Sequence, residues 1–217
     1  MPVFNLSEKP SLLNTFVSEI RDVAIQGDSM RFRKNLVRIG ELMAYEISKR
    51  LAYREKIIET PLGKHTTSII DERLVLGTIL RAGLPLHEGF LNYFDRAENA
   101  FVSAYRKYID KQHFDIHVEY ISSPTIAGKT LILADPMLAT GTSFELAYKA
   151  LLTKGVPSRI HLACVIASED GVKYLEERLD LAKINLWCAA IDPELNSKSY
   201  IVPGLGDAGD LAYGEKT

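Results

Sequence analysis

The chain has 217 residues, 47% hydrophobic and 25% charged, a composition that can bury a sizeable core in one globular domain. Its formal net charge of −2 excludes a strong overall field for nucleic acid or an anionic membrane. No apolar run reaches the length of about 18 residues that a membrane span needs, and residues 1–9 lack a secretory signal pattern. We therefore expect a cytoplasmic protein that binds neither nucleic acid nor membrane.

The predicted elements begin with two helices, over 11–20 and 29–50. The second helix carries basic residues near its start, which favour a solvated face or, alternatively, an effector or subunit contact. Residues 57–70 hold Pro61 and Gly63 between β-branched segments and predict a hairpin or an edge extension. Strands and helices then alternate. The predicted strands cover 74–80, 100–105, 117–121, 131–134, 160–167 and 184–191, and the predicted helices cover 86–94, 144–152 and 170–179.

This alternation is typical of an α/β protein with a mainly parallel central sheet that helices cover on both faces. We expect a single domain with N-terminal helices and a C-terminal arm. Residues 107–114 are polar and aperiodic and predict a mobile loop or a hairpin. Cys164 and Cys188 lie in apolar runs without metal-ligand spacing, so we expect buried free thiols. A disulfide between them would require that their strands are neighbours.

Residues 130–143 are the most informative stretch of the chain. A short apolar strand stops at Asp135 and Pro136, small and hydroxyl residues follow, and a helix begins with Thr142 or Ser143 as its predicted N-cap. A helix N-terminus attracts a phosphate, the hydroxyl groups add donors, and the one glycine lets the backbone approach closely. Because Asp135 can accept hydrogen bonds from sugar hydroxyls, the stretch indicates a ribose-phosphate site. An ordinary capped turn is the simpler alternative.

Two other stretches suggest ligand contacts. Arg81 and the Ala-Gly that follows it come after a strand and suit a diphosphate, although a plain turn has the same pattern. Arg106 follows the next strand and, taken alone, is a solvated loop residue. Residues 200–210 are rich in glycine, which lets main-chain groups approach a flat ligand such as a pyrimidine-dione. We expect no dinucleotide site from their Gly-x-Gly-x-x-Gly spacing, since too few residues follow for the βαβ unit.

Residues 131–143 resemble the phosphoribosyl-diphosphate (PRPP) motif of type I phosphoribosyltransferases, and their Asp-Pro-Met-Leu-Ala-Thr-Gly sequence resembles that of uracil phosphoribosyltransferases. Residues 81–83 and 200–210 are similar to the diphosphate loop and the uracil-binding segment of that family. The resemblance implies a type I phosphoribosyltransferase fold with a small hood or C-terminal arm. It also implies transfer of the 5-phosphoribosyl group from PRPP to uracil, giving UMP and diphosphate. A PRPP-binding pyrimidine regulator and an enzyme for another base are the alternatives.

By the same resemblance, catalysis would depend on Asp207, Arg81 and Asp135. Uracil would be bound by Ile201, Gly206, Asp207 and Ala208. The PRPP-binding residues would be Arg81, Ala82, Gly83, Arg106, Asp135, Pro136, Met137, Leu138, Ala139, Thr140, Gly141, Thr142, Ser143 and Asp207. The family also implies a strained or cis peptide near Ala82-Gly83. Many of its members have glycine where this chain has Thr142.

The family implies Mg²⁺ as the cofactor, held mainly by PRPP with a water-mediated link to Asp207, and no metal ligands from the protein itself. The histidines lack metal-ligand spacing, which agrees with this expectation. The resemblance divides the chain into N-terminal helices (about 1–52), a PRPP-binding core (about 70–195) and a uracil-binding segment (196–217). We also expect a homo-oligomer, a dimer or larger, with GTP as a candidate effector.

Overall fold

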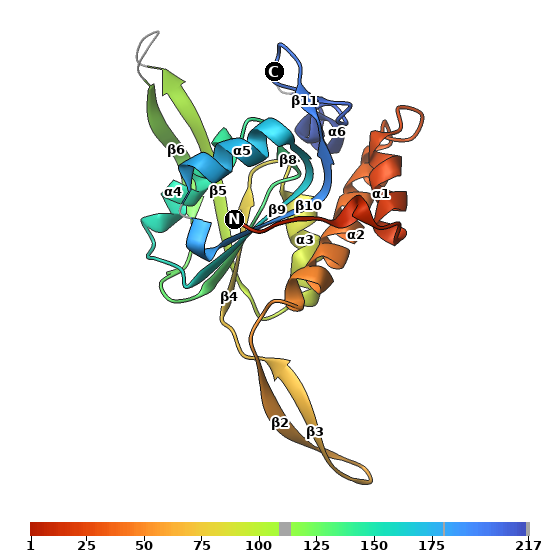
Figure 1. The fold of residues 1–217 in the computed structure, drawn as a ribbon, viewed down its shortest axis with the longest axis vertical. Helices are drawn as coiled ribbons and strands as arrows, with labels where there is room; N and C mark the ends of the chain where they lie inside the picture. Colours follow the sequence, from red (N-terminus) through yellow and green to blue (C-terminus); the bar gives the residue numbers. More distant parts are fainter. Residues whose placement is uncertain (109–113, 180, 216–217) are drawn as a thin grey trace.

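The computed structural model describes the backbone of residues 1–108, 114–179 and 181–215, and their side chains except those of residues 104–119 and 181. A central sheet runs through the molecule in the order β1-β10-β9-β7-β4-β5-β6, with the short β8 added beside β9. All neighbours in it are parallel except β5 and β6. The predicted α/β class with a mainly parallel sheet is therefore confirmed (Figure 1).

The strands of the central sheet coincide with the predicted ones to within a few residues, and β1 and β8 were not predicted because each is too short to show a pattern. Their bounds are β1 Val3–Asn5, β4 Leu74–Ile79, β5 Glu98–Tyr108, β6 Phe114–Ser122, β7 Thr130–Ala134, β8 Met137–Leu138, β9 Arg159–Ser168 and β10 Ile184–Asp192. Strands β4 and β7 are buried along their whole length. Burial on both faces explains why they are continuous apolar runs and not alternating patterns.

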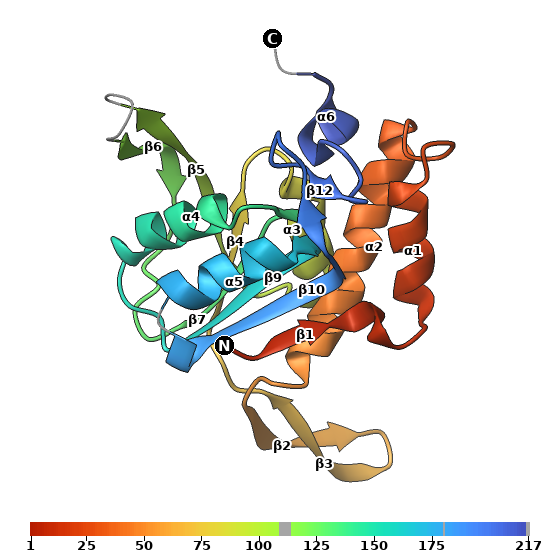
Figure 2. The same cartoon turned by 45° about the horizontal axis from the view of Figure 1, so that its top comes forward.

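Alternate side chains of the sheet enter two separate hydrophobic cores. Leu76 of β4 and Ile132 of β7 pack with the helices α1, α2 and α3 on one face. Val75 and Leu131, their neighbours in sequence, pack with α4 and α5 on the other face. The helices span α1 Leu12–Arg21, α2 Ser29–Ser48, α3 Leu84–Tyr93, α4 Thr142–Leu152, α5 Glu169–Arg178 and α6 Ala208–Tyr213. The result is three layers, helices on either side of the sheet (Figure 2).

Two hairpins extend from this body. β2 Tyr53–Thr60 and β3 Gly63–Ile70 form a separate antiparallel ribbon that projects away from the sheet, so the hairpin predicted over 57–70 is confirmed (Figures 1 and 2). β5 and β6 pair antiparallel as far as Tyr108 and Phe114, which agrees with the hairpin that was one of the two predictions for residues 107–114. Residues 109–113 lie outside the described residues.

The basic residues at the start of α2 are not simply a solvated face. Arg31 pairs with Glu19 of α1 at 2.9 Å, and Arg33 donates to the carbonyl of Ala212 in α6 at 2.6 Å. These contacts join α2 to α1 and to the C-terminal helix, which has only six residues and was not predicted. Between β10 and α6, the two-residue strands β11 Glu194–Leu195 and β12 Ile201–Val202 pair antiparallel and carry the C-terminal segment back over the sheet (Figure 2).

Cys164 and Cys188 lie directly opposite each other on β9 and β10, so their strands are neighbours. Their sulfur atoms are 3.5 Å apart, both side chains are buried, and both residues are free thiols, as expected. Burial raises the pKa of the Cys164 thiol well above its usual value, and the nearby Cys188 raises it further. Among the described residues, no helix combines the length and the apolar character needed to traverse a lipid bilayer.

Candidate active site

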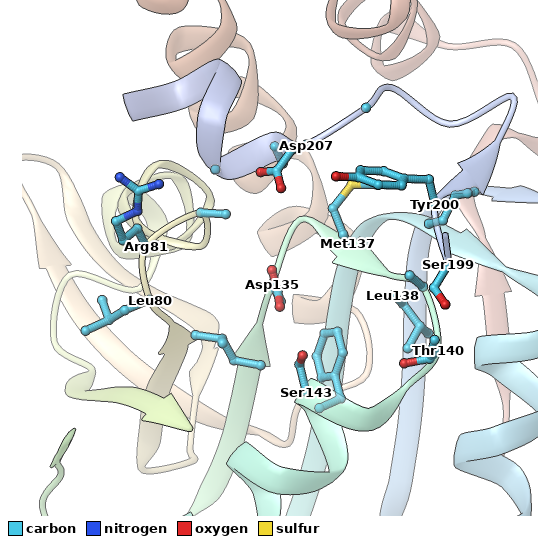
Figure 3. Close-up of a pocket in the computed structure, with 18 of the residues that line it drawn as sticks. Leu80, Arg81, Asp135, Met137, Leu138, Thr140, Ser143, Ser199, Tyr200 and Asp207 are labelled. Carbon is cyan, nitrogen blue, oxygen red and sulfur yellow. The ribbon is translucent and has the colours of Figure 1, made fainter. Parts of the chain in front are cut away.

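A cavity of about 960 Å³ opens between the carboxyl ends of β4 and β7 and the C-terminal segment. Ligands of open α/β sheets bind at this edge, beyond the ends of the parallel strands. The cavity brings together the three sequence blocks that were singled out, around Arg81, Asp135 and Asp207 (Figure 3). Of the predicted site residues, those that line it are Arg81, Ala82, Asp135, Met137, Leu138, Ala139, Thr140, Gly141, Ser143, Ile201, Gly206, Asp207 and Ala208.

Asp135 follows the last residue of β7, and its carboxyl group points into the middle of the cavity (Figure 3). Its backbone N–H donates to the carbonyl of Ala163 at 3.1 Å, which holds the end of the strand in place. The residue is only 9% exposed. Burial raises the pKa of Asp135 to about 7, and a hydrogen bond from the backbone of Met137 opposes part of this rise. This carboxyl group therefore changes its charge near neutral pH.

Pro136 supports the turn from behind and does not line the cavity. Its carbonyl accepts hydrogen bonds from the N–H groups of Val165 and Ile166, at 3.0 and 2.9 Å. The chain then runs through β8 beside β9 and enters the turn before α4. Pro136 therefore holds the loop in place, and its expected contact with PRPP stays a prediction.

Gly141 is the N-cap of α4, so the prediction of Thr142 or Ser143 at this position was wrong. The reason is the backbone: Gly141 has φ +80, a left-handed conformation, and a Cβ there would lie 2.7 Å from the ring of Tyr174. Thr142 is instead the first helical residue and is not among the residues that line the cavity. Its hydroxyl accepts a hydrogen bond from Thr140 at 3.1 Å. Ser143 does reach the cavity (Figure 3).

The N-terminal part of α5 supports the loop before α4 at Ala139. The sequence analysis did not predict this support. The hydroxyl of Ser168 donates to the carbonyl of Ala139 at 2.6 Å and accepts from the N–H of Gly171 at 2.9 Å. A Cβ on Gly171 would lie 2.3 Å from that same carbonyl. The spacing Ser168, Gly171, Tyr174 places the three residues on one side of the helix. The sequence did offer one signal, because Ser168 stands between a predicted strand and a predicted helix and is a typical N-cap residue. That signal does not show which group the Ser168 hydroxyl binds.

The loop after β4 carries Arg81. A cis peptide joins Leu80 and Arg81, so the unusual peptide expected near Ala82-Gly83 lies two bonds earlier. Gly83 does not line the cavity; it is confined, because a Cβ there would lie 2.2 Å from the hydroxyl oxygen of Thr78. One terminal nitrogen of Arg81 contacts the Asp210 carboxylate at 3.5 Å and the Gly214 carbonyl at 3.3 Å. Its Nε is buried without a hydrogen-bond partner among the described residues.

Arg106 lies in β5, but its side chain is outside the described part of the structure. On the opposite side of the cavity, Gly206 has φ +92 with open space around it, and Asp207 is the N-cap of α6. The Asp207 carboxylate accepts from the N–H of Asp210 at 3.0 Å. Tyr200, which was not predicted, also lines the cavity, and its ring lies near Met137 (Figure 3).

A phosphate, a sugar and a flat base each find suitable groups here: helix N–H groups and hydroxyls, a buried carboxyl, and exposed main-chain atoms. Within the described part of the chain there is no cluster of three or more His, Cys, Asp or Glu residues that could hold a metal ion.

Comparison with known proteins decides the family. The family model described as uracil phosphoribosyltransferase matches residues 7–215. The chain belongs to the uracil phosphoribosyltransferase family. A uracil phosphoribosyltransferase of Porphyromonas gingivalis is 60% identical over 216 residues, covering 100% of both chains. One from Thermococcus gammatolerans is 39% identical over 215 residues, covering 98% of this chain and 93% of its own.

Two solved structures are similar to this chain. The AQ2163 protein from Aquifex aeolicus superposes with a TM-score of 0.84 at 31% identity, over 99% of each chain. A hypoxanthine phosphoribosyltransferase from Staphylococcus aureus has a TM-score of 0.51 at 12% identity, over 87% of this chain and 84% of its own. The second similarity concerns the fold alone. It confirms that this member of the uracil phosphoribosyltransferase family has the expected type I phosphoribosyltransferase fold.

Proposed function

We propose that the protein transfers the 5-phosphoribosyl group from PRPP to uracil, giving UMP and diphosphate. The observation that carries this proposal is that residues from three distant parts of the chain, around Arg81, Asp135 and Asp207, line one cavity. Family membership supports the same reaction. The alternatives, a PRPP-binding regulator or an enzyme for another base, have no comparable support.

PRPP would lie along the end of the sheet. Its 5′-phosphate would bind at the N-terminus of α4, where free N–H groups and the hydroxyls of Thr140 and Ser143 are available. Its ribose hydroxyls would donate to Asp135. Its diphosphate would reach the loop of Arg81, whose buried Nε lacks a partner among the described residues. Arg106 would add a second guanidinium from β5.

Uracil would lie against the C-terminal segment. The main-chain groups of Ile201, Gly206 and Ala208 would pair with the carbonyl and N–H groups of the base, because the left-handed Gly206 leaves its backbone accessible. Asp207 would lie between the base and the ribose, near the uracil nitrogen that must lose its proton. This arrangement would direct that nitrogen at the anomeric carbon of PRPP.

The difficult step is breaking the bond between the anomeric carbon and the diphosphate, which gives the ribose an oxocarbenium character. No covalent nucleophile is needed, so catalysis would depend on orientation and charge. Arg81 and Arg106 would stabilise the departing diphosphate, and an ionised Asp135 would stabilise positive charge on the sugar. Bound Mg²⁺ would neutralise phosphate charge, held mainly by PRPP and linked to Asp207 through water.

The test is release of diphosphate from PRPP when uracil, cytosine, orotate and hypoxanthine are offered separately. Activity with uracil alone supports the proposal. Activity only with hypoxanthine would establish an enzyme for another base. If no base supports release and the protein instead causes a salt-dependent gel shift of RNA, the regulator is the correct assignment.

Four further expectations belong to this proposal. We propose a homo-oligomer, supported by exposed apolar side chains on the β2–β3 hairpin: Ile57 is 66% and Leu62 100% exposed. Light scattering tests this assembly. GTP is a candidate activator, tested by adding it to the diphosphate assay. A cytoplasmic location and the division into parts 1–52, 70–195 and 196–217 stay predictions; the free thiols of the cysteines agree with a reducing compartment.

A further inference from the structure

An ion pair outside the cavity connects the end of α1 to the end of β10. Arg21 is the last residue of α1, and Asp192 is the last residue of β10. Two nitrogens of the guanidinium donate to the two carboxylate oxygens at 2.7 and 2.8 Å. The Asp192 side chain is only 7% exposed. This parallel, two-bond geometry is the most directional form of a charge-assisted pair.

The same two side chains hold both backbone groups of Gly204. Arg21 donates to the Gly204 carbonyl at 3.0 Å, and Asp192 accepts from the Gly204 N–H at 2.9 Å. Gly204 has φ +57, and a Cβ there would lie 2.1 Å from the carbonyl oxygen of Ile201. The tight turn at Gly204 is therefore fixed from both sides. It lies between Ile201 and Gly206, which both line the cavity.

Gln26 extends this connection by one residue. Its amide nitrogen donates to the carbonyl of Leu205 at 3.3 Å and to the carbonyls of Ile20 and Arg21 at 3.0 and 3.1 Å. It therefore links the last turn of α1 to the residue that follows Gly204. Two consecutive residues of the C-terminal segment are thus positioned by side chains on or just after α1.

A buried ion pair is costly to desolvate and is weak evidence for stability alone. Here each partner also makes a hydrogen bond to one glycine, which a pair serving only to join α1 to the sheet would not need. Neither Arg21 nor Asp192 is among the described residues that line the cavity. Both can affect the base only through the backbone that they hold.

We propose that Arg21 and Asp192 are positioning residues that fix the base-binding segment and so set its selectivity for uracil; this rests on the proposed function. Uracil and cytosine differ in the donors and acceptors at two adjacent ring positions. A backbone held in one position matches the donors and acceptors of uracil and leaves those of cytosine unpaired. Polar sites discriminate strongly in this way. A backbone free to shift loses that discrimination.

The experiment compares Arg21→Gln and Asp192→Asn with the wild-type enzyme, measuring KM for uracil, KM for PRPP and the ratio of kcat/KM for uracil to that for cytosine. We expect uracil KM to rise by up to about 100-fold, since a misplacement near 1 Å can cost that much, and the selectivity ratio to fall. PRPP KM should change much less. Arg21→Lys keeps the charge but not the paired geometry and should give an intermediate uracil KM.

Arg31→Gln is the matched control, because Arg31 forms an exposed ion pair with Glu19 in the same helical pair and does not contact the segment. It should leave all three quantities unchanged. If Arg21→Gln or Asp192→Asn does not fold, Gln26→Leu decides, since it removes the hydrogen bond to Leu205 without leaving a buried charge.

Unchanged uracil KM and selectivity in folded variants would overturn the proposal, as would equal increases of both KM values, which indicate a general loss of structure. A wild-type protein that shows no activity with uracil would instead refute the proposed function. The two failures are therefore distinguishable.

Discussion

The charge of Asp135 gives the sharpest test of the site. Burial raises the pKa of this carboxyl group to about 7 in the free protein. If ribose hydroxyls donate to the carboxylate, PRPP binds the ionised form, and the protonated form must first lose its proton. With a pKa of about 7, roughly one tenth of the molecules are ionised at pH 6 and roughly nine tenths at pH 8. The apparent Kd is the intrinsic Kd divided by that fraction.

The Kd for PRPP should therefore be about tenfold weaker at pH 6 than at pH 8. Calorimetric titration of PRPP into the wild type and into Asp135→Asn, at both pH values, measures it. PRPP has its own titrating phosphates, but they contribute equally to both proteins. The difference between the two pH dependences isolates Asp135. Equal pH dependence in both proteins would refute the assignment of Asp135 as an ionised sugar contact.

The free protein provides an independent check on the same group. The folded-state pKa of Asp135 is raised from 3.8 to about 7, so the folded state binds a proton that the unfolded state has already released. The contribution to stability is complete below about pH 4 and is lost as pH rises through about 7. Each pH unit in that window lowers the free energy of unfolding by about 1.4 kcal/mol, up to about 4 kcal/mol in total. In urea unfolding at several pH values, the free energy of unfolding of Asp135→Asn should not show this decrease with pH.

Three other substitutions test the remaining parts of the site. Arg81→Ala should weaken PRPP binding by about 1.5 to 3 kcal/mol, since it removes a charged donor; an unchanged Kd in calorimetry would exclude its contact with the diphosphate. Asp207→Asn should lower turnover at least about tenfold in the diphosphate assay. Asparagine caps a helix as well as aspartate does, so the loss could not be attributed to α6. Ser168→Ala should cost about 1 kcal/mol of stability and raise KM for PRPP with little change in KM for uracil; a rise confined to uracil would contradict the support that Ser168 gives to Ala139.

The sheet could be predicted from sequence because its strands are buried on both faces. A continuous apolar run such as that of β7, which stops at Asp135 and Pro136, is typical of a buried parallel strand. The ends of the strands locate the ligand edge, so the ribose-phosphate prediction depended only on residues close together in the chain. The residues around Arg81 and in 200–210 suggested ligand contacts, and the resemblance gave each a role. Their meeting in one cavity is what the structure adds.

Prediction from local sequence failed where tertiary contacts determine the backbone conformation. Thr142 and Ser143 are better caps than glycine by intrinsic preference, yet Gly141 takes the position because the ring of Tyr174 leaves no room for a Cβ. The short elements β1 and β8 were missed for a related reason, since two or three residues carry no periodicity. Their pairing exists only because a longer strand is already in place beside them.

The contacts that hold the two halves of the site could not be recognised from the sequence. Ser168, the N-cap of α5, holds the carbonyl of Ala139, and Arg21 reaches the carbonyl of Gly204 across 183 positions of sequence. Both bind backbone carbonyls, and a carbonyl is present at every residue, so the sequence contains no partner to find. The groups that we propose as ligand contacts belong to local motifs. The orientation of those motifs depends on long-range side-chain contacts to the main chain, and only the folded structure shows which ones are made.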